Sequence, residues 1–316
     1  MKRILGLIGG VLLSAAGLAV IVTPPSAWAG EKTIRILCST FPIYQFTRNV
    51  TQGRAAAQVA PMLPTELGCP HDYTLTPKDM QLLARADVLV VNGLGLEEFL
   101  GAPIERANPA LTVIDSSKGI MDLLHYGAKL GPGEVGREEE EHQGVNPHLF
   151  VSPRLAARLV LTIAGELSRI DPAGADLYRH NGKVYAAKMT KLGQEVAALG
   201  QTLRNKRIIT QHGVFDYLAR DMRLEVVAVV EAHAGQEPSA AQMLAIIKTA
   251  KATQAGAIFA EPQYPAKVVR TLAREAGIKA ATLDPMATGP EEAALDYYEE
   301  VMIRNMATLK STLGTL

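Results

Sequence analysis

The segment DVLVVN, residues Asp87–Asn92, is a short run of apolar residues with a polar residue at each end. Helical patterns lie on both sides of it, over Thr76–Ala86 and Glu97–Ala107. A strand that is apolar at successive positions buries both of its faces, which is typical of a parallel sheet covered by helices on both sides. The segment therefore indicates an α/β fold built on a parallel sheet.

The same alternation of strand and helix occurs in both halves of the chain. The expected strands are Thr33–Ser39, Val59–Leu63, Asp87–Asn92 and Leu111–Asp115 in the first half, and Arg207–Gln211, Glu225–Val230, Ala257–Ala260 and Ala280–Leu283 in the second. The helices expected in the second half are Gly213–Met222, Ser239–Thr253 and Pro265–Ala276. These patterns predict two doubly wound parallel-sheet lobes.

The middle of the chain contains two long helical patterns and no strand pattern. They are Pro153–Ile170 and Ala175–Leu203, separated by the helix-breaking pair Asp171-Pro172. The second would be roughly 40 Å long at 1.5 Å per residue, enough to join two lobes stiffly. We expect an N-terminal metal-binding lobe at 30–174, a linking helix at 175–205, and a C-terminal lobe at 206–316 that ends in a helix over Pro290–Leu313.

The first 29 residues have the pattern of a secretory signal peptide. Lys2 and Arg3 precede the apolar run Ile4–Val22, and Ala27-Trp28-Ala29 offers a cleavage site. An uncleaved membrane anchor is the alternative, because the run is nearly long enough to span a bilayer. Cleavage is favoured, with the mature chain starting near Gly30 in a periplasmic or other extracytoplasmic location.

Charge and cysteine content exclude several classes of protein. The 316 residues include 32 basic and 32 acidic side chains, so no net charge favours nucleic acid or anionic lipid. Cys38 and Cys69 are the two cysteines, too few for a disulfide-dense scaffold. They could form one disulfide, or remain free.

Four side chains fall where strands end. His71, in the dipeptide Pro70-His71, follows the second strand, and His148, in Pro147-His148, follows the last strand of the first half. His212 follows the strand Arg207–Gln211, and Asp284 follows Ala280–Leu283. Ligands of open α/β sheets bind at the carboxyl ends of strands, so these residues can face one another across a cleft.

Three imidazoles and one carboxylate form a donor set for a divalent metal. Zn(II) accepts this set in tetrahedral geometry, whereas Mn(II) favours more oxygen ligands. We therefore predict a zinc site formed by His71, His148, His212 and Asp284, with Mn(II) as the alternative metal. Glu261, at the end of the strand Ala257–Ala260, could orient a ligand or replace Asp284 as the carboxylate.

Several short motifs around these residues resemble those of one family. His71-Asp72-Tyr73-Thr74-Leu75-Thr76-Pro77, Asn146-Pro147-His148-Leu149-Phe150, Gln211-His212-Gly213 and Thr282-Leu283-Asp284-Pro285 resemble the ligand motifs of cluster A-I periplasmic metal-binding proteins. The resemblance runs from about Ile34 to the C-terminus. It implies a monomeric receptor, not an enzyme, that delivers zinc or manganese to the membrane permease of an ABC importer with its cytoplasmic ATPase.

Three departures from that family's pattern concern the site. Cys69 replaces the usual acidic residue before the first Pro-His, so its thiolate could contact the metal if it is not paired with Cys38. Phe150 replaces a tryptophan. The acidic run Glu138–Glu141 with His142 stands where many members have a long histidine-rich loop, and we interpret it as a solvated loop.

Two other classes of function are compatible with parts of the sequence. A zinc hydrolase could use three histidines as ligands and Asp284 as general base. The chain has no His-Glu-x-x-His helix, nucleophile elbow or phosphate-binding glycine loop, which argues against it. A receptor for a metal chelate such as haem or a siderophore would have the same two-lobed fold, with a wider cleft.

Overall fold

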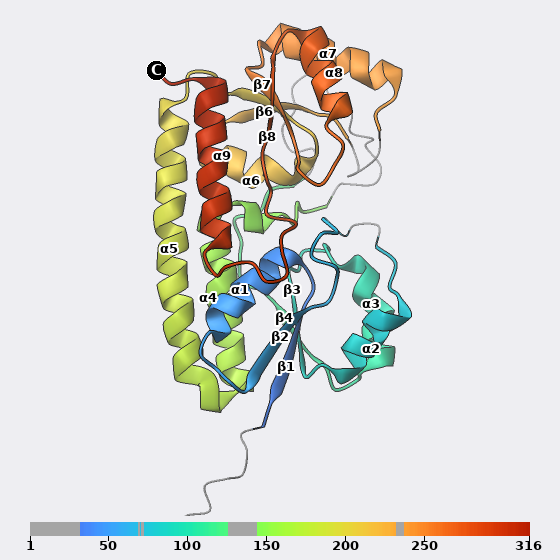
Figure 1. Ribbon diagram of the computed structural model, residues 1–316, viewed down its shortest axis with the longest axis vertical. Helices are drawn as coiled ribbons and strands as arrows, with labels where there is room; N and C mark the ends of the chain where they lie inside the picture. Colours follow the sequence, from blue (N-terminus) through green and yellow to red (C-terminus); the bar gives the residue numbers. More distant parts are fainter. Residues whose placement is uncertain (1–31, 69, 71–72, 126–143, 232–236) are drawn as a thin grey trace, which may run out of the picture. The chain divides into compact units, whose positions relative to one another are not determined.

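Two four-stranded parallel sheets form the framework of the protein (Figure 1). The computed structural model describes residues 32–68, 70, 73–125, 144–231 and 237–316. The first sheet has the order β2-β1-β3-β4 and the second β6-β5-β7-β8. The strands are β1 (Ile34–Cys38), β2 (Ala57–Pro61), β3 (Val88–Val91), β4 (Thr112–Asp115), β5 (Arg207–Thr210), β6 (Glu225–Val229), β7 (Ala257–Ala260) and β8 (Lys279–Thr282). The predicted fold class is confirmed.

Helices cover both faces of the first sheet. Ile36 and Cys38 of β1 pack on the side of α1 (Phe41–Thr51) and α4 (Pro153–Ile170). Leu37, between them, packs on the opposite side with residues of α2 (Pro77–Arg85) and of the turn before α3 (Gly101–Ala107). Successive side chains of a strand point to opposite faces, which explains why the strands are apolar throughout.

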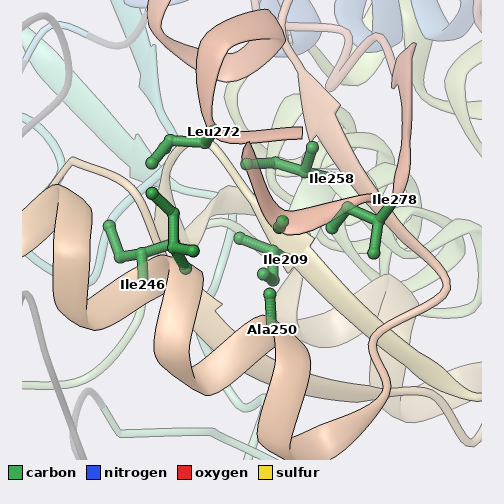
Figure 2. A pocket seen from close by; sticks show the side chains of 8 residues that line it. Ile209, Ile246, Ala250, Ile258, Leu272 and Ile278 are labelled. Atoms are coloured by element: carbon green, nitrogen blue, oxygen red, sulfur yellow. The ribbon is translucent and has the colours of Figure 1, made fainter. Parts of the chain in front are cut away.

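The second sheet is covered in the same way. Its outer face packs against α7 (Ala240–Thr253) and α8 (Lys267–Ala276), and its inner face against α6 (Asp216–Asp221) and α9 (Tyr297–Leu313). Figure 2 shows a small apolar hollow between α7, α8 and the sheet. It is lined by Ile209, Ile246, Ile247, Ala250, Ile258, Leu272, Ala276 and Ile278. Because these side chains are all aliphatic, the hollow offers no polar group to orient a ligand.

The long helix α5 (Ala175–Thr202) runs beside both sheets (Figure 1). It packs along α4 and α1 in the first lobe and contacts α6 and α9 in the second. Gly182 allows the close approach of α5 to α4, since a Cβ there would lie 2.4 Å from the Cβ of Ala164. One continuous hydrophobic core joins β1, the α4–α5 pair and β7. The domain boundaries given above remain a prediction.

Two helices differ from the sequence-based expectation. Helix α1 was not expected, and all but one of its residues are buried. Helix α9 begins at Tyr297, seven residues after Pro290. The preceding carbonyl groups are engaged by α1, since Ala293, Ala294 and Leu295 accept hydrogen bonds from its side chains.

Some predictions concern residues outside the described part of the chain. These are the signal peptide, Cys69, His71, and the acidic run with His142. None of the helices in the described ranges combines the length and the apolar character needed to cross a membrane.

Candidate metal site

The carboxyl edge of the second sheet positions three of the candidate side chains. His212 follows β5 with one residue between them, and Glu261 follows β7 directly. Asp284 is the second residue after β8. This edge is where the sequence predicted the site.

His148 comes from the first lobe. It is completely buried and precedes a short 3-10 turn, Leu149–Val151, that leads into α4. The preceding residue, Pro147, accepts a hydrogen bond through its carbonyl oxygen from the Asn92 side chain at 2.9 Å. Because Asn92 follows β3 directly, this bond holds His148 at the carboxyl edge of the first sheet.

The imidazoles of His148 and His212 meet between the two lobes. Their ring centroids are 5.0 Å apart and their planes are perpendicular. His212 is 4% exposed and His148 is not exposed. Two imidazoles bound tetrahedrally to one zinc ion at about 2.0–2.1 Å would have centroids about 5 Å apart. The spacing of this histidine pair therefore fits a shared ion.

Glu261 lies beside His212. Its Oε1 atom is 3.6 Å from His212 Nδ1, which is longer than a hydrogen bond, and the side chain is fully buried. Its Oε2 atom accepts a hydrogen bond from Gln263 at 2.7 Å. Within the described residues, Glu261 Oε1 has no hydrogen-bond partner. Burying a carboxylate oxygen without a partner is energetically costly, and a bound cation would offset that cost.

Asp284 is held mainly by its backbone. Its N–H donates to Asn305 Oδ1 at 2.9 Å, its carbonyl accepts from Asn305 Nδ2 at 2.7 Å, and its carboxylate accepts from the Met286 N–H. Burial raises the pKa of the Asp284 carboxyl, and the negative charge of Glu261 raises it further. A cation placed between the two carboxylates would relieve this repulsion.

One protein family matches both lobes and the helix between them. The model of the family ZnuA, described as the periplasmic component A of the zinc-uptake complex, matches residues 36–312. The match includes His148, His212, Glu261 and Asp284, and it spans His71. The chain belongs to the ZnuA family.

Relatives of the ZnuA family differ in how much of their length this chain covers. The high-affinity zinc uptake system protein ZnuA of Bacillus subtilis is 29% identical over 288 residues, which make up 90% of this chain and 88% of that protein. The zinc-binding lipoprotein AdcA of Streptococcus pneumoniae is 27% identical over 314 residues. That alignment covers 99% of this chain but only 61% of AdcA.

A solved structure of similar architecture holds a divalent metal. The binding protein FpvC of Pseudomonas aeruginosa in complex with Mn²⁺ matches with a TM-score of 0.77 and 32% identity, over 89% of this chain and 99% of that chain. The same protein has also been solved in complex with Ni²⁺.

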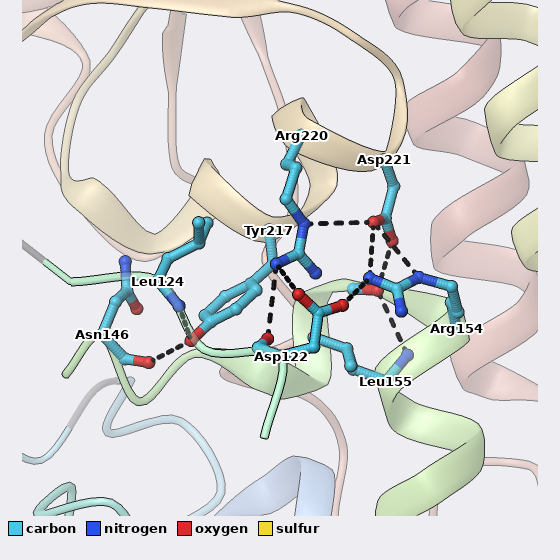
Figure 3. Close-up of polar contacts among 9 residues, drawn as sticks. Asp122, Leu124, Asn146, Arg154, Leu155, Tyr217, Arg220 and Asp221 are labelled. Atoms are coloured by element: carbon cyan, nitrogen blue, oxygen red, sulfur yellow. Dashed lines mark hydrogen bonds and ion pairs between the residues drawn. The ribbon is translucent and has the colours of Figure 1, made fainter. Parts of the chain in front are cut away.

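A polar cluster connects α4 of the first lobe with α6 of the second in this ZnuA-family chain (Figure 3). Arg154 at the start of α4 and Arg220 in α6 both bind Asp122, at 2.8 and 3.0 Å. Both arginines also contact Asp221. The Tyr217 hydroxyl accepts from the Leu124 N–H and donates to the carbonyl of Asn146. Nothing in the sequence distinguished the four charged residues of this cluster from ordinary surface charges.

A buried carboxylate stabilises the loop that holds His148. Glu97 accepts hydrogen bonds from the Ser39 hydroxyl at 2.6 Å, the Asn92 N–H at 2.7 Å and the Gly93 N–H at 3.0 Å. Burial raises the pKa of Glu97 to about 7, although these three donors act to lower it. Sequence reasoning treated Glu97 only as the start of a helix.

Not every predicted ligand can be placed. His71 lies outside the described residues, and among those that are described no three His, Cys, Asp or Glu side chains are positioned to hold one metal ion. The prediction of a four-ligand site thus remains a prediction. Cys38 is a buried thiol, and burial raises its pKa to about 12.

Proposed function

We propose that this protein is an extracytoplasmic receptor that binds a divalent metal ion, most readily Zn(II), and delivers it to the permease of an ABC importer driven by a separate ATPase. The proposed ligands are His71, His148, His212 and Asp284. The observation that carries the proposal is the buried histidine pair, one imidazole from each lobe, at a spacing that suits a shared zinc ion. The zinc-binding names of its relatives support the choice of metal.

Capture of the ion involves binding alone, and no chemical reaction takes place. Neutral imidazoles and a carboxylate replace the water molecules around the metal, and four protein ligands leave no position for a catalytic water. We therefore propose a binding protein and not a zinc hydrolase. We place it outside the cytoplasm because of the predicted signal peptide, and we expect it to act as a monomer.

Titration of the metal-free mature chain, starting at Gly30, tests this function. Calorimetry with Zn²⁺ is expected to show one tight site, and Mn²⁺ is expected to bind less tightly because the donor set is rich in nitrogen. Zinc at 100 times its dissociation constant would stabilise the fold by about 2.7 kcal/mol, seen as a higher melting temperature. The absence of tight binding of either metal would overturn the proposal.

A pair of isosteric variants distinguishes the carboxylate ligand from its neighbour. Asp284→Asn should weaken zinc binding by about two orders of magnitude if one of four ligands is lost. Glu261→Gln should cost about 10- to 100-fold at most, because we assign Glu261 to orienting the His212 ring. Competition with a chromogenic chelator measures both. The control is Glu299→Gln, which removes a carboxylate of α9 that accepts a hydrogen bond from Tyr185 of α5. A larger loss for Glu261→Gln than for Asp284→Asn would make Glu261 the ligand.

A further inference from the structure

We propose that Asn146 is a positioning residue that fixes the tautomer of His148 and sets the spacing between the two histidines before the metal arrives. The inference rests on the proposed function, because it concerns how that site is prepared. It is carried by the contacts of one fully buried side-chain amide that reaches both lobes.

The orientation of the Asn146 amide is determined by its partners. Its Oδ1 atom accepts a hydrogen bond from the His148 backbone N–H at 3.0 Å, and a backbone N–H can only donate. Its Nδ2 atom donates to the Gly213 carbonyl at 3.0 Å and to the Asp216 carboxylate at 3.1 Å, which can only accept. Exchanging the oxygen and nitrogen would place donor against donor and acceptor against acceptors, so one orientation is allowed.

This orientation determines which nitrogen of His148 carries the proton. The ring Nδ1 atom lies 2.9 Å from Asn146 Oδ1, which is an acceptor. Nδ1 must therefore be the donor, and in the neutral ring the lone pair then resides on Nε2. A metal ion needs that lone pair, so His148 holds the tautomer that binds through Nε2 without a proton shift.

The other end of the same amide reaches the second histidine. Gly213, whose carbonyl accepts from Nδ2, follows His212 directly in the chain. The backbone of Asn146 is held as well, since its N–H donates to the Leu124 carbonyl at 2.8 Å and its carbonyl accepts from Tyr217 at 2.8 Å. One residue thus fixes the His148 ring and the loop that carries His212. Such preorganisation reduces the cost of ordering the ligands on binding.

The test combines NMR and zinc affinity. Long-range ¹H–¹⁵N correlation spectra of the metal-free protein distinguish a protonated from a bare ring nitrogen, and the His148 signals are assigned by their loss in His148→Gln. Wild-type protein should show His148 as the Nδ1–H tautomer. Asn146→Ala should lose this single tautomer and bind Zn²⁺ about 10- to 100-fold more weakly. Asn146→Asp keeps an acceptor beside Nδ1 but places an oxygen against the Gly213 carbonyl and the Asp216 carboxylate, so it should retain the His148 tautomer while losing the link to the His212 loop and the wild-type affinity.

Asn49→Ala is the matched control. Asn49 is also buried, and its amide donates to two carbonyls, those of Gln45 and Leu295, away from the histidines. It should lose stability yet keep the wild-type zinc affinity and the His148 tautomer. An Nε2–H tautomer in the wild-type protein would overturn the proposal even if the Asn146 variants do not fold. So would a folded Asn146→Ala protein with unchanged affinity. Wild-type protein with the expected tautomer and no zinc affinity would refute the proposed function alone.

Discussion

Replacing His212 by alanine is expected to weaken zinc binding by about two orders of magnitude. Structural zinc sites bind with roughly 12 kcal/mol, so one ligand in four accounts for about 3 kcal/mol. His148→Ala should have an effect of the same size, because the two rings face the same space with their centroids 5.0 Å apart. Chelator competition at constant pH measures both variants. Losses of this size in both variants would indicate that both rings bind the same ion.

His180→Ala provides the control for the histidine variants. His180 is an exposed residue of α5, and its removal should leave the zinc affinity unchanged. Metal-free melting temperatures show whether each variant is folded. Wild-type affinity in folded His212→Ala protein would remove His212 from the site and with it the proposed ligand set.

Replacing Glu97 by glutamine is expected to remove a pH-dependent contribution to the free energy of unfolding, which is the second large effect. Burial raises the pKa of Glu97 from 4.5 to about 7, a change that corresponds to on the order of 3 kcal/mol. Below about pH 4.5 the carboxyl is protonated in the folded and the unfolded chain. Between about pH 4.5 and 7 the folded chain holds more protons, so the free energy of unfolding decreases as the pH rises. Above about pH 7 no further stability is lost.

Urea unfolding between pH 4 and 8 measures this effect. The free energy of unfolding of the wild type minus that of Glu97→Gln should fall by up to about 3 kcal/mol as the pH rises across that range. Glu98→Gln, which removes an exposed carboxylate from the next position, controls for the loss of a surface charge. An equal fall for both variants, or none for Glu97→Gln, would contradict the assignment of the effect to the buried carboxyl.

The parts of the fold that could be predicted depend on local patterns. The strands β3 and β7 are continuously apolar, and α4 begins with Ser152 and Pro153, a cap and a first-turn proline that are readable from sequence. The positions of His148 and His212 followed from the rule that ligands gather where strands end. These signals lie within a few residues of the element they define.

The parts that could not be predicted depend on distant partners. Helix α1 is buried on nearly every side, in part by α4 and α5 from the middle of the chain. The role of Glu97 arises from Ser39, which is 58 positions away, and that of Asn146 from Gly213, which is 67 positions away. The motif Asn146-Pro147-His148 placed Asn146 close to a candidate ligand, but contacts with residues this far along the chain leave no local pattern that shows what the amide does.

The core that continues from the first sheet through α4 and α5 into the second has a consequence for how the loaded receptor is recognised. Lobes with a common interior cannot swing apart without breaking that interior, so the empty and loaded forms should have nearly the same outline. A divalent cation bound at the proposed site would instead add two positive charges beside the carboxylates of Glu261 and Asp284. We infer that a transport partner distinguishes the two forms by this change in electrostatic potential and not by a change in shape.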